Sequence, residues 1–563
     1  MSALERNGIN PLTQADFYKT GHIFQYPEGT ELVYSNFTPR SARLAPVIPE
    51  LYDGKVVWFG LQGFIKSFLI DLWNRNFFGQ PKEQVVSRYR RRLDTALGPG
   101  AVPVDHIERL WDLGYLPLEI RALPEGSRVD IGVPALTVIN TDPDFYWLTN
   151  YIETVLSNEL WKPTTTATIA FEYRKLLTAY ARLTGAPEDF VSWQGHDFSA
   201  RGMSGMADAM QAGAGHLLSF TGTDTISAID YLEDWYNADA ERELIGGSVP
   251  ATEHSVMCMG GFEDELETFR RLITEVYPSG IVSIVSDTWD FFRVITDYAS
   301  RLKEEIENRR PDALGNAKVV FRPDSGDPVD ILTGEAIEVA DLEAATLLPI
   351  LKSRAGGRAY ARRAGEFFEL FAEGDAGVRA QAVAAAPSLK GAVECLWEVF
   401  GGSLSAKGYR MLNPRVGLIY GDSITLLRAQ AILSRLAAKG FASSNVVLGI
   451  GSYTYQYLTR DSFGWAMKAT WGVVRGEARE LFKDPVTDSG TKRSARGLLR
   501  VEKEQGRYRL FDRQSPQQAA GGELLPVFRN GNLLVDASLA EIRERLMASW
   551  VPDSISSSDL IEA

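Results

Sequence analysis

Charged side chains that could do chemistry recur in this chain directly after short apolar runs. The clearest case is VVFRPDSGDP at residues 319–328, where an apolar, β-branched half gives way to Arg322, Pro323, Asp324 and a glycine turn. An unpaired charge is costly to bury, so Arg322 and Asp324 must pair, bind a ligand or face water. This pattern is typical of the site-bearing edge of an α/β protein. Taken alone, it fits an ordinary strand exit with a surface ion pair about equally well.

Several further apolar runs end in the same way. They are FVSWQGHDFSARGMSG (190–205), HLLSFTGTDT (216–225), VSIVSDTWD (282–290), RVGLIYGDSI (415–424) and NVVLGIGSYT (445–454). Helical stretches lie between most of them. Repeated units of strand, polar turn and helix are typical of a parallel α/β barrel, in which the carboxyl ends of all strands meet at one face. We therefore predict an irregular parallel α/β barrel.

The residues at these strand ends suit a phosphorylated sugar. The predicted pocket contains Asp197, Arg201, Asp224, His254, Asp287, Arg322, Asp324 and Asp422, with glycines at 326, 421, 449 and 451. Glycine turns at helix N-termini offer N–H groups to phosphate, and arginine binds phosphate with two hydrogen bonds. Carboxylates suit Mg²⁺ or ribose hydroxyls. His254 could titrate or act as a nucleophile, and it could equally be a satisfied buried imidazole beside Glu253.

The composition is that of a globular protein. The chain has 563 residues, of which 45% are hydrophobic, and a net charge of −14. This charge argues against nucleic acid as a main partner, although a local basic pocket could still bind a small polyanion. The two cysteines, Cys258 and Cys395, make no disulfide framework and fit a reducing cytoplasm. Because no run approaches the length of a membrane span or a signal core, we expect a soluble cytoplasmic protein without a membrane partner.

Both ends of the chain predict a β-rich α+β domain. ELVYSNF at 31–37 alternates like a half-buried strand, residues 116–139 are short strands broken by turns, and the tail contains an Asn-Gly hairpin turn at 530–531. We therefore divide the chain into three parts. They are the N-terminal part of the β-rich domain with flanking helices (1–185), the barrel (186–455) and the C-terminal part of the β-rich domain (456–563). The Ala- and Arg-rich interval at about 340–410 predicts a helical insertion between two barrel strands.

These motifs, in their order, resemble the nicotinamide phosphoribosyltransferase family, including its bacterial and phage members. The resemblance runs from DFYKTGH at 16 to KDPVTDSGTKRS at 483–494. It rests on LPLEIRALPEGSRV, NTDPDFYWLTN, GHDFSARG, FTGTDT, GGSVPATEHS, VSIVSD, FRPDSGDP, YGDS and YLTRD. The resemblance implies a type II phosphoribosyltransferase fold that is active as a homodimer with sites at the subunit interface. It also implies transfer of the phosphoribosyl group of 5-phosphoribosyl 1-pyrophosphate (PRPP) to nicotinamide, which yields nicotinamide mononucleotide and pyrophosphate.

The resemblance assigns residues to the nicotinamide base. It implies that Phe198 stacks on one face of the pyridine ring, the partner subunit's Tyr18 stacks on the other, and Asp224 accepts a hydrogen bond from the carboxamide. The further residues that it implies around the base are Asp16, Arg201, Ser248, Val249 and Ala251.

The resemblance also assigns residues to PRPP. Asp287 and Asp324 would bind the ribose, with Arg201 and Arg322 lining the region between base and phosphate. The 5′-phosphate would be held by Gly421, Asp422, Gly451 and Ser452, and the pyrophosphate by Arg40, Arg460, Lys468, Lys483 and Lys492. Without the resemblance, the basic residues of the tail are typical of a solvated β-hairpin face.

A catalytic set and two cofactors follow from the same resemblance. His254 matches the phosphorylatable histidine of the family and would act with Asp287, Arg322 and Asp324. ATP, as an activating co-substrate, would phosphorylate His254 and favour the productive complex. Mg²⁺ would be carried mainly by pyrophosphate and would stabilise its departing charge.

The chain departs from the animal enzymes at the phosphate loops, and three rival functions stay open. Ser423, Ser452 and Tyr453 occupy positions that are glycine in the animal enzymes. The rivals are a nicotinate phosphoribosyltransferase, a non-catalytic binding protein on the same fold, and a barrel enzyme for another phosphorylated sugar. Asp224 disfavours the first, because a carboxylate attracts the NH₂ group of nicotinamide and repels the carboxylate of nicotinate.

Overall fold

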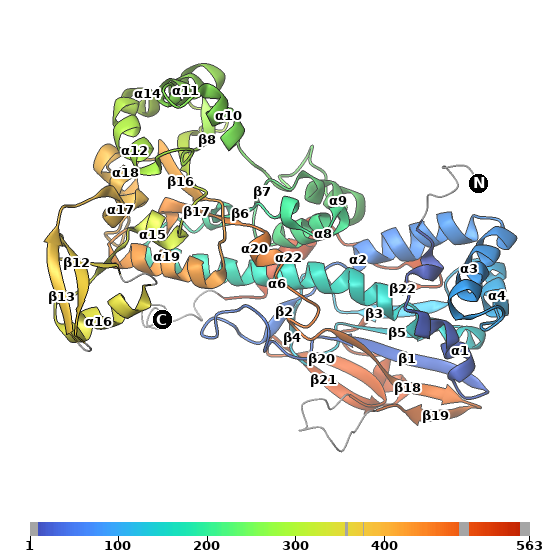
Figure 1. Cartoon of the computed structure of the whole chain (residues 1–563). Coiled ribbons are helices and arrows are strands. Elements are labelled where there is room, and N and C mark those ends of the chain that lie inside the picture. Colours follow the sequence, from blue (N-terminus) through green and yellow to red (C-terminus); the bar gives the residue numbers. More distant parts are fainter. Residues whose placement is uncertain (1–8, 355–357, 375–376, 483–494, 552–563) are drawn as a thin grey trace.

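One long helix, α6 (Glu153–Thr184), runs across the middle of the molecule between a parallel and an antiparallel sheet (Figure 1). The computed structural model describes residues 9–354, 358–374, 377–482 and 495–551. Helix α6 is buried along most of its length because it packs against α8 and α19 on the parallel side and against β2 and β18 on the antiparallel side. It is the common support of both domains.

Pro163 lies inside α6, and the helix continues from Glu153 through the proline. A proline inside a helix removes one backbone hydrogen bond. Here its ring is packed tightly, and a Cβ built on Gly60 would lie 2.5 Å from Pro163 Cγ. Tertiary packing therefore overrides the local preference for a helix boundary.

The parallel sheet has the strand order β7-β6-β17-β16-β9-β8. Its strands are β6 (Gly195–Asp197), β7 (Gly222–Thr223), β8 (Gly280–Val285), β9 (Ala317–Arg322), β16 (Val416–Tyr420) and β17 (Val446–Ile450). The gap between β7 and β8 is bridged by residues 247–252. Thr223 N donates to Gly247 O at 2.9 Å on one side, and Ser283 N donates to Pro250 O at 2.9 Å on the other. The sheet therefore closes into an irregular barrel, as predicted.

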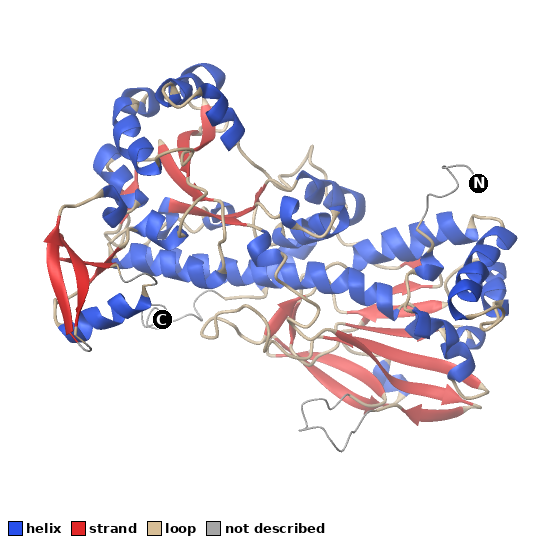
Figure 2. Ribbon diagram, in the orientation of Figure 1, coloured by secondary structure: helices blue, strands red, loops and turns tan. Residues whose placement is uncertain are grey.

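Helices connect and cover the barrel strands (Figure 2). They are α7 (Val191–Gln194), α8 (Met206–His216), α9 (Ile226–Tyr236), α10 (His254–Gly260), α11 (Glu265–Arg271), α12 (Phe291–Arg293), α13 (Ala299–Arg301), α14 (Lys303–Glu307), α15 (Pro328–Thr333), α18 (Ala392–Phe400), α19 (Leu426–Ala438) and α20 (Ser452–Tyr455). FVSWQ and HLLSF, which the sequence predicted as strand, lie mainly in α7 and at the end of α8. Only short strands follow them.

The β-rich domain is built from both ends of the chain, as predicted. Its main sheet has the order β19-β18-β1-β5-β3-β22-β23, in which the N-terminal β1 pairs with the C-terminal β18. The strands are β1 (Thr30–Thr38), β3 (Leu118–Ala122), β5 (Leu136–Asn140), β18 (Ala466–Val474), β19 (Glu477–Glu480), β22 (Leu525–Arg529) and β23 (Asn532–Leu533). Two smaller pairs are β2 (Lys55–Val57) with β4 (Arg128–Asp130), and β20 (Leu498–Glu504) with β21 (Arg507–Gln514). Asn530 and Gly531 form the predicted hairpin turn, both with positive φ.

Further helices belong to the two terminal parts of the chain. They are α1 (His22–Gln25), α2 (Leu61–Phe64), α3 (Lys82–Leu97), α4 (Asp105–Leu113), α5 (Leu148–Tyr151), α21 (Pro516–Ala519) and α22 (Leu539–Ala548). Helix α2 continues in wider π-helical turns over Ile65–Leu72 and Asn74–Phe78. No helix among the described residues is both long and apolar enough to cross a membrane.

The insertion at about 340–410 contains helices, as predicted, but it also contains strands that were not predicted. After α16 (Ala344–Ser353) the chain forms three antiparallel strands that extend β10 (Ala336–Glu338) into a four-stranded sheet. These strands are β11 (Ala359–Arg363), β12 (Glu366–Glu373) and β13 (Gly377–Val383), and they precede α17 (Pro387–Lys390), α18 and the pair β14 (Gly402–Leu404) and β15 (Arg410–Leu412). Alanine, arginine and glutamate are good helix formers, but helix propensity is a weak determinant of structure. The pairing of β11 with β12 outweighs it here.

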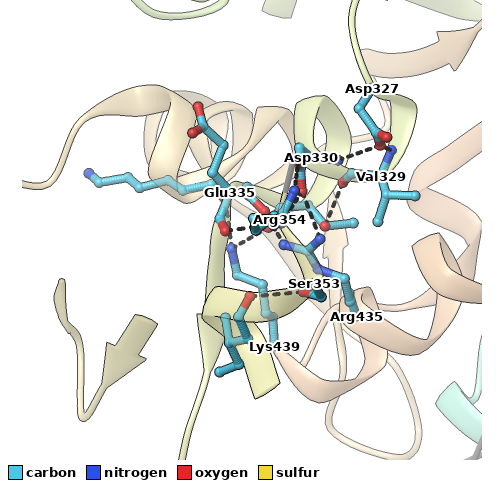
Figure 3. Close-up of polar contacts among 12 residues, drawn as sticks. Asp327, Val329, Asp330, Glu335, Ser353, Arg354, Arg435 and Lys439 are labelled. Carbon is cyan, nitrogen blue, oxygen red and sulfur yellow. Dashed lines mark hydrogen bonds and ion pairs between the residues drawn. The ribbon is translucent and has the colours of Figure 1, made fainter. Parts of the chain in front are cut away.

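A partly buried ion cluster fastens this insertion to the barrel (Figure 3). Asp330 Oδ1 of α15 accepts hydrogen bonds from Arg354, after α16, at 2.8 Å and from Arg435 of α19 at 2.9 Å. Burial alone would raise the pKa of Asp330, but the two guanidinium groups hold it below its ordinary value. Lys439 donates to Thr333 O at 2.9 Å in the same cluster. The insertion is therefore held by paired charges rather than by an apolar face alone.

Candidate active site

The register of the parallel sheet brings the predicted strand-end residues to one edge. Val285 pairs with Arg322, Tyr420 with Leu448, Ile450 with Asp197, and Asp197 with Thr223. The residues that follow these strand ends are Asp287, Asp324, Asp422, Gly451, Phe198 and Asp224. They lie side by side although up to about 250 positions of sequence separate them.

Asp287 organises the acidic part of this edge. Its Oδ2 accepts hydrogen bonds from Asp324 N at 2.9 Å and from Ser325 Oγ at 2.6 Å. Its Oδ1 is buried and has no hydrogen-bond partner among the described residues. The imidazole Nε2 of His254 lies 3.7 Å from this Oδ1. An unpaired buried carboxylate oxygen is costly, so this atom favours a proton donor or a ligand.

His254 stands at the N-terminus of α10, and 48% of its side chain is exposed. Its Nδ1 lies 3.3 Å from Thr288 Oγ1. Glu253 accepts a hydrogen bond from Ser255 instead of from the imidazole. The reading of His254 as a satisfied buried imidazole beside Glu253 is therefore wrong, and its ring is accessible to a reactant.

Arg322 and Asp324 lie beside this pair. Arg322 Nη2 donates to Thr252 O at 2.5 Å, while its Nε is buried without a partner among the described residues. Burial, and then the charges of Asp287 and Asp422, raise the pKa of Asp324, while Arg322 and His254 act in the opposite direction. Acidic groups held this close together favour the binding of positive charge.

A second acceptor site forms around Asp224. Its Oδ1 accepts from Ser248 Oγ at 2.6 Å and lies 2.9 Å from His196 Nε2, whereas no hydrogen bond to its Oδ2 is found among the described residues. Burial would raise the pKa of Asp224, but these hydrogen bonds, with His196 first, hold it below its ordinary value. The ring of Phe198 lies 4.6 Å from that of His196. His196 thus contacts both the carboxylate of Asp224 and the ring of Phe198. Asp224 Oδ2 and this ring together suit a flat ligand with an N–H donor.

The remaining residues predicted near this acceptor lie on two loops. Ser248, Val249 and Ala251 belong to the segment that closes the barrel, where Ala251 pairs with Ser283. Arg201 is exposed in a short 3₁₀ turn after Phe198. The structure therefore brings all four to the strand-end edge.

The structure changes the interpretation of two neighbouring residues, Asp197 and His196. Asp197 does not face the pocket as predicted: it is fully buried and accepts from Thr225 Oγ1 at 2.7 Å and from Ser199 N at 2.9 Å. It therefore fixes the turn structurally. His196 was given no role, although it contacts Asp224. Its partner Asp224 lies 28 residues away in the sequence, so no local pattern indicates the contact. Its place at the end of a predicted strand was the one signal that the sequence offered.

Glycines allow the strand ends to approach closely. A Cβ on Gly449 would lie 2.6 Å from Phe198 Cδ2 and 2.8 Å from Gly421 Cα, and a Cβ on Gly421 would lie 2.9 Å from Asp324 Oδ1. Nearby, Ser423 adopts φ +51°, a conformation that glycine takes more readily. A glycine would adopt this conformation without the steric cost of a Cβ.

Ser452 and Tyr453 open the short helix α20, for which Gly451 is the N-cap residue. The ring of Tyr453 lies 4.9 Å from that of Tyr457, and the guanidinium of Arg428 lies 5.7 Å from it. Tyr453 is 47% exposed, so its ring does not fill the loop.

A separate pocket of about 240 Å³ contains Asp16, Tyr18 and Arg460. Its other lining residues are Glu153, Thr154, Ser157, Asn158 and Trp161. The ring of Tyr18 is 60% exposed and lies 5.4 Å from that of His22, at the start of α1. Figure 1 places α1 beside the antiparallel sheet and away from β6 and β7. Among the described residues, the ring of Tyr18 pairs with that of His22 and the ring of Phe198 with that of His196, and Phe198 does not line the pocket of Tyr18.

The predicted basic residues are distributed around the antiparallel sheet. Arg40 Nε donates to Gly464 O at 2.9 Å, close to the turn that contains Arg460, and Lys468 is exposed on β18. Lys483 and Lys492 lie outside the described residues. Within the described part of the chain, no group of three or more His, Cys, Asp or Glu side chains could hold a metal ion.

Comparison with known proteins identifies similar sequences. Residues 193–519 match the model of the "Nicotinate phosphoribosyltransferase (NAPRTase) family", and residues 10–89 match "Nicotinamide phosphoribosyltransferase, N-terminal domain". A protein of Acinetobacter baylyi named nicotinamide phosphoribosyltransferase is 61% identical over 96% of this chain and 97% of its own length. A protein of the same name from Xanthomonas campestris is 31% identical over 95% of this chain and 97% of its own.

The fold is similar to that of a solved structure as well. The crystal structure of nicotinate-nucleotide pyrophosphorylase from Pyrococcus furiosus matches with a TM-score of 0.51. The match covers 99% of this chain and 98% of that chain at 13% sequence identity. At this identity the match establishes the likeness of fold alone.

The close approach at Gly449 predicts the effect of a single methyl group. Gly449→Ala should push the ring of Phe198 and the backbone at Gly421 apart and lower the free energy of unfolding by about 1–3 kcal/mol. Chemical denaturation followed by fluorescence measures this loss.

Gly451→Ala is the matched control for that substitution. Its Cβ would meet only Phe198 O at 3.9 Å, and its φ of −106° suits alanine. The two variants should therefore differ clearly in stability. Equal stability would contradict the packing argument.

Proposed function

The chain belongs to the nicotinate phosphoribosyltransferase family, and from this premise we propose that it transfers the phosphoribosyl group of PRPP to nicotinamide. The products are nicotinamide mononucleotide and pyrophosphate, a step of NAD salvage. The observation that carries the proposal is the Asp224 carboxylate, held through one oxygen by His196 and Ser248 beside the ring of Phe198. The relatives named nicotinamide phosphoribosyltransferase support the same base.

Base recognition follows from the free oxygen of Asp224. The pyridine ring stacks on Phe198, and the carboxamide NH₂ donates to Oδ2. A carboxylate on the ligand would meet a second negative charge instead, at a distance where repulsion costs several kcal/mol in a partly buried site. Asp224 therefore selects nicotinamide over nicotinate and also orients the ring nitrogen towards the ribose.

The transfer step moves positive charge onto the ribose. The pyridine nitrogen approaches C1′ as the bond between C1′ and the pyrophosphate oxygen breaks, and the sugar passes through a cation-like state. Asp287 and Asp324, with Asp422 nearby, stabilise this charge, and Arg322 lines the phosphate side. The glycine turns at 421 and 451 hold the 5′-phosphate through backbone N–H groups.

The leaving pyrophosphate meets basic residues of the β-rich domain. Arg40, Arg460 and Lys468 are proposed for this role, together with Lys483 and Lys492. Mg²⁺ supplies charge neutralisation when it is bound to pyrophosphate.

Nicotinate is the second candidate base, because the family model that matches most of the barrel is named for it. The deciding experiment measures mononucleotide formed from labelled nicotinamide and PRPP with Mg²⁺, with and without excess nicotinate. Product that resists competition supports the proposal. Product from nicotinate alone assigns the chain to the sister activity. Absence of product from both bases favours the non-catalytic binding protein or a barrel enzyme for another phosphorylated sugar.

Asp224→Asn should weaken the preference for nicotinamide. Removal of the negative charge abolishes the repulsion, so the ratio of kcat/KM for nicotinamide to that for nicotinate should fall by about a hundredfold. Steady-state kinetics with each base measures the ratio. Asp422→Asn is the matched control, since it makes the same chemical change at another strand end of the barrel and should leave the ratio unchanged. An unchanged ratio in Asp224→Asn contradicts this account of base selection.

We further propose that ATP activates the enzyme by phosphorylating His254. An imidazole nitrogen attacks the γ-phosphorus, the bond to the ADP oxygen breaks, and ADP leaves; water later hydrolyses the N–P bond. Two observations support this role: His254 is half exposed, and its Nε2 faces the unpaired Oδ1 of Asp287, which can accept a proton. The phosphorylated ring would add negative charge next to the ribose site and favour the cationic state.

His254→Ala should abolish incorporation of the γ-phosphate and the increase in mononucleotide yield caused by ATP. Acid-labile, base-stable label from γ-labelled ATP measures the first effect, and it should fall by at least about tenfold. His22→Ala, another histidine-to-alanine change at the first turn of a helix, should keep the label. Retention of label in His254→Ala contradicts the assignment.

A homodimer completes the proposal. Tyr18, Asp16 and Arg460 share a pocket that does not include the strand-end residues of the same chain. A second copy can place the partner's Tyr18 against Phe198. Each site then contains residues from two chains.

Mixing two inactive variants tests this arrangement. Tyr18→Ala and Asp324→Ala damage different halves of a shared site, so mixed dimers contain one intact site and the mixture should recover about a quarter of wild-type activity. Co-expression followed by activity measurement gives the value. A mixture of Asp324→Ala and Asp287→Ala should recover none, because both residues come from the same chain. Recovery in neither mixture contradicts the shared site.

A cytoplasmic location belongs to the proposal as well. Both Cys258 and Cys395 are free thiols, which fits a reducing compartment.

A further inference from the structure

Helix α6 buries a lysine that the proposed reaction does not use. The ammonium group of Lys162 donates to Tyr455 O at 2.8 Å and to Gln456 Oε1 at 3.4 Å, and it lies 3.3 Å from Asp208 Oδ1. Only 5% of the side chain is exposed. A buried ammonium needs such partners because its desolvation is costly. Its three partners come from two segments far apart in the sequence.

The same partners are joined to each other through Ser204. Asp208 Oδ2 accepts from Ser204 N at 2.8 Å, and Gln456 Nε2 donates to Ser204 Oγ at 2.5 Å. Lys162, Asp208, Ser204 and Gln456 therefore form a closed ring of hydrogen bonds and one ion pair, which we call the Lys162 ring. The Lys162 ring joins the loop before α8 to the end of α20.

The two segments also touch directly. A Cβ built on Gly202 would lie 2.2 Å from Ser452 Oγ, so no side chain fits between them. The first segment carries Arg201, and the second carries Gly451 and Ser452. The family resemblance assigns these three residues to the ribose-phosphate region of PRPP, and the proposed function places the 5′-phosphate at the Gly451 turn. A shift of one segment against the other would move the guanidinium relative to the backbone N–H groups of the phosphate turn.

We propose that Lys162 is a positioning residue that fixes the Arg201 loop against the phosphate turn at Gly451 and thereby sets the affinity for PRPP. The proposal rests on the proposed function. Lys162 and Asp208 carry opposite charges, so the pair adds no net charge to the site. We attribute its effect to the geometry of the phosphate contacts. Lys162→Met also leaves Asp208 uncompensated, whereas Ser204→Ala changes no charge and therefore tests the geometry alone.

Lys162→Met tests the proposal, because methionine keeps the unbranched apolar stem and removes the ammonium. The KM for PRPP should rise by about tenfold, as expected when a hydrogen-bonded support is lost, while the KM for nicotinamide should change by less than about twofold. Ser204→Ala removes only an exposed hydroxyl of the Lys162 ring and does not threaten folding. It should raise the KM for PRPP in the same direction, by about threefold.

Gln211→Leu is the matched control. Gln211 Nε2 of α8 donates to Glu159 Oε2 of α6 at 2.6 Å, so it joins the same two helices but contacts neither segment. Its KM for PRPP should stay within about twofold of the wild-type value. A general loosening of α6 against α8 would instead raise the KM equally in Gln211→Leu and Lys162→Met, and that result would overturn the proposal.

Binding of PRPP alone separates this proposal from the proposed function. Titration calorimetry of PRPP with Mg²⁺ needs no base and no turnover. Weaker binding in Lys162→Met and Ser204→Ala, with unchanged binding in Gln211→Leu, supports the positioning role even if the base is not nicotinamide. Equal affinity for PRPP in the wild type, Lys162→Met and Ser204→Ala overturns the positioning role, whatever reaction the wild type catalyses. A wild type that binds no PRPP overturns it as well.

Discussion

The parallel register of the six barrel strands is the constraint on which the site depends. Because the strands run in parallel, with Val285 paired to Arg322 and Ile450 paired to Asp197, the residues that follow these strands emerge at the same edge of the sheet. The segment 247–252 closes the ring through backbone hydrogen bonds to β7 and β8, and this places Ser248 next to Asp224. The chemistry is thus a consequence of backbone pairing, and the glycines at 421 and 449 permit the close approach that the pairing demands.

The carboxylates at this edge of the sheet have two different electrostatic environments. Asp224 receives hydrogen bonds that hold its pKa below the ordinary value, so it stays charged and acts as a fixed acceptor. Asp324 lies among other acidic groups, and burial and their charges raise its pKa. A cationic state relieves that repulsion. The first arrangement suits recognition of a neutral donor, and the second suits stabilisation of positive charge, so the site divides into a base end and a ribose end.

The sequence predicted those features that local pattern determines. Apolar runs that end in Asp, Gly or Arg revealed β8, β9, β16 and β17, and the alternation at 31–37 revealed β1. The prediction of a helical insertion missed the strands at 359–383, because alanine and arginine favour helix, whereas pairing of β11 with β12 decides the structure there. The contact of His196 with Asp224 and the burial of Asp197 depend on which strands become neighbours, and periodicity in one segment carries no such information.

The position of α6 explains how distant segments act as one site. The helix touches both domains, so a side chain on one of its faces can hold loops that arrive from different parts of the chain. Pro163 leaves a gap in the backbone hydrogen-bond ladder, yet the ring packs against Gly60 and the helix stays continuous. Lys162, immediately before it, then reaches Tyr455 and Asp208 from a fixed backbone. If α6 were flexible, side-chain entropy would be lost each time a phosphate group bound. Because α6 is rigid, this entropy is lost once, when the protein folds.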